Sequence, residues 1–307
     1  MPQVSVIVPN YNHAVYLTQR IDSILSQSYQ DFELIILDDC SGDDSKTVIE
    51  TFRGHPKISH IIYNDENSGS TFRQWEKGIA AARGEFIWIA ESDDWCEQNM
   101  LEELVSGIKK EQNCVISYCQ SYCIHGTNKI GWVSQHPYLS EIIEGHNFIR
   151  QYLLMNNSIF NASMVLWKKQ LHQDISREFL NYKFCGDWLF WIELARRGNI
   201  HVSGRTLNYF RKHENDVSGK ATKSGLDIME TLDVLNIIYT QKLITDQDYN
   251  KAAKRHFRNY RSQKSGLDPG ISKKIERSFQ HPASSGFSYT QMLLSAIWHN
   301  LRRKTRS

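Results

Sequence analysis

The chain has 307 residues, enough to bury the core of one large domain with an appendage or of two domains. Its 36 lysines and arginines nearly balance 34 aspartates and glutamates, which argues against a nucleic-acid binder that works through bulk positive charge. No apolar stretch approaches the roughly twenty residues that a membrane-spanning helix needs, and the N-terminus runs into a predicted strand without a signal sequence, so we expect a cytoplasmic protein.

The first 125 residues alternate short apolar runs with segments whose apolar side chains recur at helical spacing. The apolar runs predict strands at residues 4–8, 32–37, 58–63, 85–90 and 114–123. The helical spacing predicts helices over residues 17–25, from about residue 43, over 70–83 and over 100–108. This alternation predicts an α/β fold in which helices flank a mainly parallel sheet.

Beyond residue 125 the pattern is less regular. The turn-rich segment 126–145 fits either an irregular insert or a β-hairpin. Later segments predict a short strand at 164–167, a helix at 188–197, one or two strands within 201–211, and only helices from Ser224 onward. A break near Gly219 divides the chain into a domain at 1–219, with halves at 1–110 and 111–219, and a helical region at 220–307.

Two of the predicted strands end in acidic residues. The strand at 32–37 runs into Asp38 and Asp39, and the strand at 85–90 runs into Glu-Ser-Asp-Asp at 91–94. In an open α/β sheet, ligands bind just beyond the carboxyl ends of the strands. Clustered carboxylates repel one another unless a cation or ligand offsets their charge. We expect Mg²⁺ or Mn²⁺ carrying a phosphorylated ligand, because hard oxygen ligands suit these ions.

Strand geometry also predicts which of these carboxylates act together. Side chains alternate faces along a strand, so Glu91 and Asp93 should point the same way and Asp94 away from them. Glu91 and Asp93 are therefore the expected pair for a diphosphate and its metal. The alternative is that the acidic turn only caps a helix that starts near Cys96.

Several ordered segments of this chain resemble the family 2 glycosyltransferases, which are inverting enzymes with the GT-A fold. The matching segments are 4–12 (VSVIVPNYN), 27–43 (QSYQDFELIILDDCSGD), 67–70 (NSGS) and 78–94 (GIAAARGEFIWIAESDD). Looser matches follow at 186–188 (GDW) and 209–213 (YFRKH). The resemblance implies transfer of a sugar from a nucleotide-diphosphate donor of the UDP, dTDP or GDP type, with Mn²⁺ or Mg²⁺. It makes 1–219 the catalytic domain, with a nucleotide-binding half and an acceptor half.

The resemblance also assigns residues to the donor nucleotide. Asp39 matches the carboxylate that accepts a hydrogen bond from the base, and Pro9, Tyr11 and Asn12 match the residues that shape the pocket for base and ribose. Tyr11 and Asn12 could instead be ordinary turn residues. Arg73 could reach a phosphate, or could lie on a solvated helix face.

The metal motif corresponds to Glu91, Ser92 and Asp93, with Glu91 at a position where the family usually has Asp. Glu still supplies oxygen ligands, so we expect Glu91 and Asp93 to bind the metal. His213 could touch the metal or the diphosphate, although a histidine in a polar loop is often only solvated.

Asp187 matches the catalytic base of the family. Inverting transfer needs one carboxylate to take the proton of the acceptor hydroxyl as that hydroxyl attacks the anomeric carbon. Asp187 precedes a predicted helix, whose dipole would favour the ionised carboxylate. The same position suits a helix N-cap, so a purely structural role stays open.

The C-terminal segment 287–306 pairs an apolar helix face with basic residues. Leu293, Leu294, Ile297, Trp298 and Leu301 share one face, and Arg302, Arg303, Lys304 and Arg306 follow. Such a helix could lie on an anionic membrane, at the inner membrane face. It could equally pack against a core or a second subunit of a homo-oligomer.

The sequence leaves the acceptor open between a saccharide and a lipid-linked saccharide, as in the building of bacterial surface polysaccharides. Two other functions compete with sugar transfer. A non-catalytic nucleotide-sugar binding or scaffold protein would keep the donor motifs without using Asp187 as a base. A sugar-phosphate nucleotidyltransferase would need an N-terminal glycine-rich loop, which residues 8–12 (VPNYN) do not provide.

Overall fold

The computed structural model describes residues 1–307 except 127–128, 214–220, 222–223, 281–288 and 305–307. The chain forms two compact units that do not simply follow one another in sequence. The first unit contains residues 1–148, 159–181 and 190–213. The second contains 149–158, 182–189 and 214–307. The sequence boundary near Gly219 lies outside the described residues.

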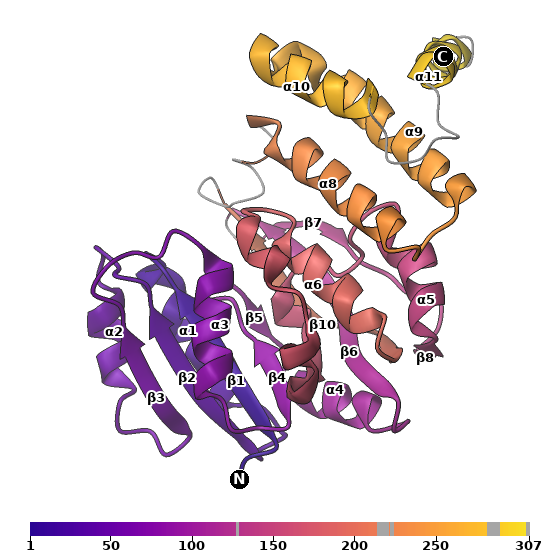
Figure 1. Cartoon of the computed structure of the whole chain (residues 1–307). Coiled ribbons are helices and arrows are strands. Elements are labelled where there is room, and N and C mark those ends of the chain that lie inside the picture. Colours follow the sequence, from indigo (N-terminus) through magenta and orange to yellow (C-terminus); the bar gives the residue numbers. More distant parts are fainter. Residues whose placement is uncertain (127–128, 214–220, 222–223, 281–288, 305–307) are drawn as a thin grey trace. The chain divides into compact units, whose positions relative to one another are not determined.

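The first unit is built on a ten-stranded sheet with helices on both faces (Figure 1). Its main strand order is β3-β2-β1-β4-β9-β6-β10-β5, with β7 paired to β6 and β8 paired to β10. The strands are β1 Val4–Asn10, β2 Phe32–Asp38, β3 Ile58–Tyr63, β4 Phe86–Ile89, β5 Trp95–Cys96, β6 Cys114–His125, β7 Lys129–Val133, β8 Ser140–Ile143, β9 Val165–Lys168 and β10 Asn199–Lys212.

The sheet is parallel where the sequence alternates strand and helix, and mixed where it does not. β1 pairs in parallel with β2 and β4, β2 with β3, and β6 with β10. β5, β7, β8 and β9 all pair antiparallel. The predicted α/β fold with a central sheet between helices is therefore confirmed, and the short strands β5, β7, β8 and β9 add antiparallel pairs to its parallel core. Segment 126–145 follows the β-hairpin alternative, because β7 folds back on β6.

The helices of the first unit cover the sheet with their apolar faces. They are α1 Ala14–Leu25, α2 Ser45–Thr51, α3 Thr71–Ala81, α4 Met100–Ile108 and α5 Gly145–Phe148. Helix α6, Gly186–Ala195, begins in the second unit and ends in the first. In α1, Leu17, Ile21 and Ile24 are fully buried, as the helical spacing predicts. Burial on this scale contributes roughly 1.5–3 kcal/mol for each large apolar side chain.

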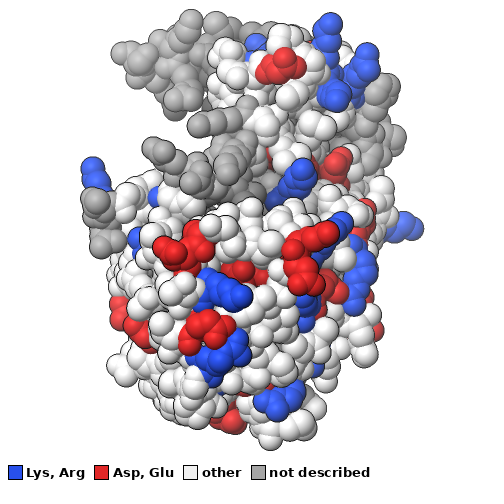
Figure 2. All heavy atoms as spheres, turned by 90° about the vertical axis from the view of Figure 1, so that its left-hand side faces the viewer, with Lys and Arg blue, Asp and Glu red and all other residues white. Residues whose placement is uncertain are grey.

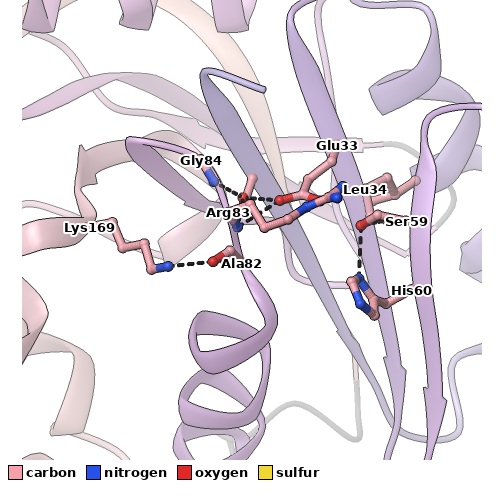
Figure 3. Close-up of polar contacts among 9 residues, drawn as sticks. Glu33, Leu34, Ser59, His60, Ala82, Arg83, Gly84 and Lys169 are labelled. Atoms are coloured by element: carbon pink, nitrogen blue, oxygen red, sulfur yellow. Dashed lines mark hydrogen bonds and ion pairs between the residues drawn. The ribbon is translucent and has the colours of Figure 1, made fainter. Parts of the chain in front are cut away.

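A buried carboxylate fixes the amino-terminal edge of this sheet (Figure 3). Glu33 on β2 accepts hydrogen bonds from the Ser5 hydroxyl at 2.7 Å and from the backbone N–H and guanidinium of Arg83 at 2.7–2.9 Å. Although burial alone would raise the pKa of Glu33, these bonds hold it below its ordinary value. Lys169 donates to the Ala82 carbonyl in the same turn.

The turn needs glycine at position 84. A Cβ atom there would lie 2.5 Å from the backbone nitrogen of Ser5, so the backbone could not approach β1 as it does. Gly84 donates its N–H to the Ser5 hydroxyl at 2.8 Å. This close approach starts β4 beside β1 in a fixed register, and β4 then carries residues 91–94 to the opposite edge of the sheet.

The second unit is helical in its described C-terminal part. Its helices are α8 Leu226–Thr240, α9 Asp246–Gln263, α10 Pro269–Gln280 and α11 Tyr289–Lys304. Their core contains Ile228, Leu232, Phe257, Tyr260, Ile275, Phe279 and Met292. Segments 149–158 and 182–189 belong to this same unit. No helix in the described ranges is both long enough and apolar enough to cross a bilayer.

Charged side chains are mixed on the face of the first unit that Figure 2 displays, where acidic and basic groups lie next to one another. This distribution agrees with the near balance of charge in the sequence. That face offers no broad basic surface of the kind that holds a nucleic-acid backbone.

Candidate active site

The carboxyl ends of β1, β2 and β4 meet at one edge of the sheet. Asn10 at the end of β1 lies opposite Asp38 at the end of β2, and Ile7 of β1 lies opposite Ile89 of β4. The Asn10 amide donates to Asp38 Oδ2 at 2.7 Å. This register gathers the loop after β1, the residues after β2 and the segment 91–94 at the edge where the sequence predicts the donor site.

The loop after β1 is held by its own polar groups. Asn12 and Cys40 both adopt left-handed backbone conformations, with φ of 56° and 62°, which permit two sharp turns. Asn12 Oδ1 accepts from the Gly42 N–H at 2.8 Å, and the Asn12 N–H donates to Ser41 Oγ at 2.9 Å. Pro9 is buried within β1, whereas the Tyr11 ring is 48% exposed. The role of Pro9, Tyr11 and Asn12 in shaping a base and ribose pocket stays a prediction.

Asp39 organises the loop that leads into α3. Its carboxylate accepts hydrogen bonds from the side chains of Asn64, Asn67, Ser68 and Gln74 and from the Ser68 N–H, at 2.6–3.2 Å. Asp39 therefore fixes the wall of the predicted base pocket, and its contact with the base stays a prediction. Arg73, one residue before Gln74, is exposed on α3.

Three side chains from separate segments converge beside the end of β4. The ligand atoms of His13, Asp93 and His213 all lie within 4.8 Å of one another. His213 Nε2 lies 3.0 Å from Asp93 Oδ2, and His13 Nδ1 lies 2.8 Å from the Ser92 hydroxyl. We call this set the His-Asp-His cluster. The sequence predicts Asp93 and His213 at this site but not His13, although His13 directly follows the predicted base-binding loop.

The chemistry of the His-Asp-His cluster fits a divalent metal ion. Burial lowers the pKa of His13, so its imidazole is neutral and can offer a lone pair. Burial alone would raise the pKa of Asp93, but the hydrogen bond with His213 holds it below its ordinary value. Two imidazoles and one carboxylate suit a transition ion such as Mn²⁺ better than Mg²⁺, which prefers oxygen ligands.

Glu91 and Asp94 have other partners. Glu91 Oε1 accepts from Trp75 Nε1 at 3.1 Å, and burial, with the charge of Asp93, raises the pKa of Glu91 to about 8. Asp94 is buried and accepts from the Asn161 amide at 2.5 Å and the Ser163 hydroxyl at 2.6 Å. The described residues thus place Asp93, but neither of its acidic neighbours, in the His-Asp-His cluster. Metal binding by Glu91 remains a prediction that this arrangement does not support.

Arg211 ties the end of β10 to the acidic segment, a role the sequence analysis did not foresee. Its N–H donates to Asp94 Oδ1 at 3.0 Å and its Nε to the Asp93 carbonyl at 2.9 Å. The guanidinium lies 4.5 Å from the ring centroids of both Tyr16 and Trp95. This cation–π sandwich positions His213, two residues further along, against Asp93.

Asp187 lies in the second unit, in the first turn of α6. Its Oδ1 accepts from the Trp188 N–H at 2.7 Å and its Oδ2 from the Asn157 amide at 3.2 Å. An N-cap carboxylate would accept from a residue two or three positions further on, so this pattern differs from an ordinary cap. Burial raises the pKa of Asp187 to about 7, which suits a general base at neutral pH.

Comparisons with known proteins agree with this architecture. The model of the family described as glycosyl transferase family 2 matches residues 5–175. The chain is 32% identical, over 73% of its length and 84% of the relative's, to the putative teichuronic acid biosynthesis glycosyltransferase TuaG of Bacillus subtilis (strain 168). It is 24% identical, over 84% of its length and 81% of the relative's, to the GalNAc(5)-diNAcBac-PP-undecaprenol beta-1,3-glucosyltransferase of Campylobacter jejuni.

Among solved structures, the chain resembles S. aureus TarS 1-349 in complex with UDP-GlcNAc. The TM-score is 0.69 at 21% identity, over 91% of this chain and 80% of that one. This likeness confirms the GT-A fold predicted from the sequence, with helices at the C-terminal end. The family match ends before Asp187 and the helical region begin.

Proposed function

This chain belongs to glycosyl transferase family 2 and is a glycosyltransferase, and we propose that it moves a sugar from a nucleotide-diphosphate donor to an acceptor hydroxyl with inversion. The observation that carries the proposal is the His-Asp-His cluster at the carboxyl ends of the central strands. It lies where open α/β sheets bind ligands, beside the loop with the exposed Tyr11 ring. A UDP-type donor has support from the UDP-GlcNAc bound to TarS.

In this proposal the donor binds across the edge of the sheet. Tyr11 supplies an aromatic face for the base, and Asn12 and Asp39 keep the two surrounding loops in place through the hydrogen bonds described above. His13, Asp93 and His213 would hold Mn²⁺ or Mg²⁺. When bound, this ion supplies positive charge that stabilises the leaving nucleoside diphosphate. Arg211 supports Asp93 in this role by donating a hydrogen bond to its carbonyl.

Asp187 is the proposed general base. It takes the proton of the acceptor hydroxyl while that oxygen forms a bond to the anomeric carbon and the bond from this carbon to the diphosphate breaks. Because the attack comes from the face opposite the leaving group, the configuration inverts and no second carboxylate acts as nucleophile. The pKa of about 7 keeps much of Asp187 ionised at neutral pH.

The proposed acceptor is a saccharide or a lipid-linked saccharide. The named activity of the Campylobacter jejuni relative, on an undecaprenol-linked substrate, supports the lipid-linked form. The name of TuaG, which refers to teichuronic acid biosynthesis, agrees with a saccharide acceptor. Peripheral membrane contact through α11 would bring the enzyme to such an acceptor, because α11 exposes Leu294 and Trp298.

A thermal-shift screen of UDP-, dTDP- and GDP-sugars, with and without Mn²⁺, tests the donor half of the proposal. A ligand at 100 times its Kd stabilises the folded state by about 2.7 kcal/mol. We expect one nucleotide class to raise Tm only when Mn²⁺ is present. Stabilisation by the same nucleotide that is independent of added metal and of EDTA would contradict the metal-assisted mechanism.

A further inference from the structure

Helix α8 carries a buried carboxylate that binds the segment just before Asp187. Glu230 is 7% exposed. Its Oε1 accepts from the Lys183 N–H at 2.9 Å, and its Oε2 accepts from the N–H groups of Phe184 at 2.8 Å and Cys185 at 2.7 Å. One side chain thus satisfies three successive backbone donors. Hydrogen bonds to an ionised acceptor are about twice as strong as neutral ones.

These donors stand immediately before α6, which begins at Gly186. Backbone N–H groups at a helix start have no partner within the helix, and negative charge is favoured there by the helix dipole. A residue next in sequence usually serves as the cap. Here the carboxylate comes from a helix about 46 residues further along the chain, so the C-terminal helical region fixes how α6 begins.

Asp187 is also held from its other side by the second unit. Asn157 donates to its Oδ2 at 3.2 Å, and Trp188, the next residue, donates its indole N–H to the Leu153 carbonyl at 2.9 Å. Segment 149–158 and α8 therefore bracket the base. Of these contacts, the Glu230 bonds are the most numerous and involve an ionised acceptor.

We infer that Glu230 is a positioning residue for sugar transfer, which fixes residues 183–185 so that Asp187 meets the acceptor hydroxyl in the geometry needed for proton transfer. This inference rests on the proposed role of Asp187 as base. Misplacement of a reacting group by about 1 Å can cost about 10²-fold in rate, so loss of the three bonds should be visible in turnover.

Glu230 also acts on Asp187 through its charge. Burial is the main cause of the raised pKa of Asp187, and the negative charge of Glu230 raises it further. Among the described residues, Cys185 also interacts with Asp187, since burial and then the charge of Asp187 raise the pKa of Cys185. Removing the Glu230 charge should therefore lower the pKa of Asp187. This is a readout that a merely structural role of Glu230 would not produce.

The test uses Glu230→Gln in the full-length enzyme, with Glu276→Gln as the matched control. Glu276 lies on α10 of the same unit and pairs with Lys264 at 2.6 Å, away from residues 183–185. We expect Glu230→Gln to lower kcat for transfer at least about 10-fold. Its affinity for UDP with Mn²⁺ should stay unchanged, and the acid limb of its pH–rate profile should move to lower pH. The control should match the wild type in all three.

The inference is overturned if Glu230→Gln folds and keeps the wild-type kcat and pH profile while Asp187→Asn is inactive; the proposed base would then still stand. Full activity of Asp187→Asn would instead remove the base and this inference together. If the Gln variant does not fold, Glu230→Asp decides. Its carboxylate keeps the charge but is one methylene short, so we expect a lowered kcat with a nearly unchanged pH profile, and an unchanged kcat would overturn the inference.

Discussion

The two units hold their key carboxylates in different ways. In the first unit, Asp93 follows a central strand, and the sheet register brings it beside the loops after β1 and β2, where Arg211 of β10 also contacts it. In the second unit, Asp187 accepts a hydrogen bond from Asn157, about 30 residues before it. Glu230, about 43 residues after it, binds the backbone of residues 183–185 just before it. Sheet pairing thus places Asp93, with added support from Arg211, whereas the position of Asp187 at the start of α6 depends on distant side chains.

The largest effect that separates the two units is expected for Asp187→Asn. The amide cannot take a proton, so sugar-transfer turnover should fall about 10²-fold or more. UDP binding should be kept, because the His-Asp-His cluster belongs to the first unit. Turnover with a matched nucleotide sugar and acceptor measures this directly. Near-normal turnover in a stable variant would end the assignment, and a large fall in Tm would favour a structural role.

The neighbouring carboxylates Asp93 and Asp94 allow a sharper comparison within the first unit. Asp93→Asn should weaken Mn²⁺-dependent nucleotide binding by about 10–100-fold, the scale of lost support at metal sites, with little change in Tm. Asp94→Asn should instead lower Tm and leave Mn²⁺-dependent nucleotide binding nearly unchanged. Its amide would face the amide of Asn161, which donates to Asp94 at 2.5 Å, at a cost of about 1–3 kcal/mol in the free energy of unfolding.

Calorimetry and thermal melts on these two variants separate the roles. Equal losses of metal-dependent affinity in both would show that the segment 91–94 acts as one unit. The distinction drawn from the different partners of Asp93 and Asp94 would then be wrong.

The pH dependence of transfer should follow Asp187. A carboxyl with a pKa of about 7 is protonated below that pH, so kcat/KM should fall about tenfold per unit of pH on the acid side and level off above it. The raised pKa of Asp187 also makes the free energy of unfolding depend on pH. The folded state binds this proton more tightly than the unfolded state does, so the contribution of Asp187 to the free energy of unfolding decreases as pH rises from about 4 to about 7.

A pH–rate profile of the wild type, with constant ionic strength, checks this expectation. Donor-binding affinity measured over the same range serves as the control, because protonation of His13 at low pH would weaken the donor site as well. A transfer rate that is flat from pH 5.5 to 8 would contradict the role of Asp187 as base.

The smallest expected effect on activity lies in α11. Met292 is buried in the core of the second unit, whereas Leu294 and Trp298 are 61% and 59% exposed. Met292→Ala should lower the free energy of unfolding by about 2–5 kcal/mol. The double variant Leu294→Ser and Trp298→Ser should lower it far less, because both side chains are more than half exposed. Truncation before Phe287 would remove Met292 together with the exposed residues, so it cannot separate the two roles.

Sedimentation with anionic liposomes then tests the membrane contact. The basic residues at the end of α11 would contribute about 1 kcal/mol each near an anionic surface. We expect the wild type to sediment at low salt and the double variant to sediment less. If the wild type and the double variant both stay in the supernatant, α11 packs in the core of the second unit without binding the membrane. The proposal of a lipid-linked acceptor then loses the support of membrane contact.

The sequence predicted the parts that depend on local pattern. Alternating strands and helices predict the parallel first half of the sheet, and acidic residues after the strands at 32–37 and 85–90 predict the edge at which Asp93 lies. The antiparallel pairing of β7 agrees with the β-hairpin alternative for 126–145. The antiparallel pairing of β5, β8 and β9 was not predicted, because short strands without crossover helices carry no signal for pairing direction.

The residues that the sequence analysis missed act over long distances. Arg211 binds the segment 91–94 from more than a hundred residues away, and Glu230 binds residues 183–185 from another helix. No spacing rule links such pairs. His13 is different, because it follows the base-binding loop directly, and only its convergence with Asp93 and His213 reveals a ligand set. The predicted metal ligand Glu91 shows the limit of strand alternation, since its carboxylate contacts Trp75 of α3.

The central claim is that the first unit binds the donor with a metal and that Asp187 acts only in transfer. Calorimetric titration of UDP into the wild type, Asp93→Asn and Asp187→Asn, each with Mn²⁺ and with EDTA, tests it most directly. We expect the wild type and Asp187→Asn to bind UDP alike and only with Mn²⁺, and Asp93→Asn to bind UDP weakly in both conditions. Metal-dependent binding that survives in Asp93→Asn and is lost in Asp187→Asn would contradict it.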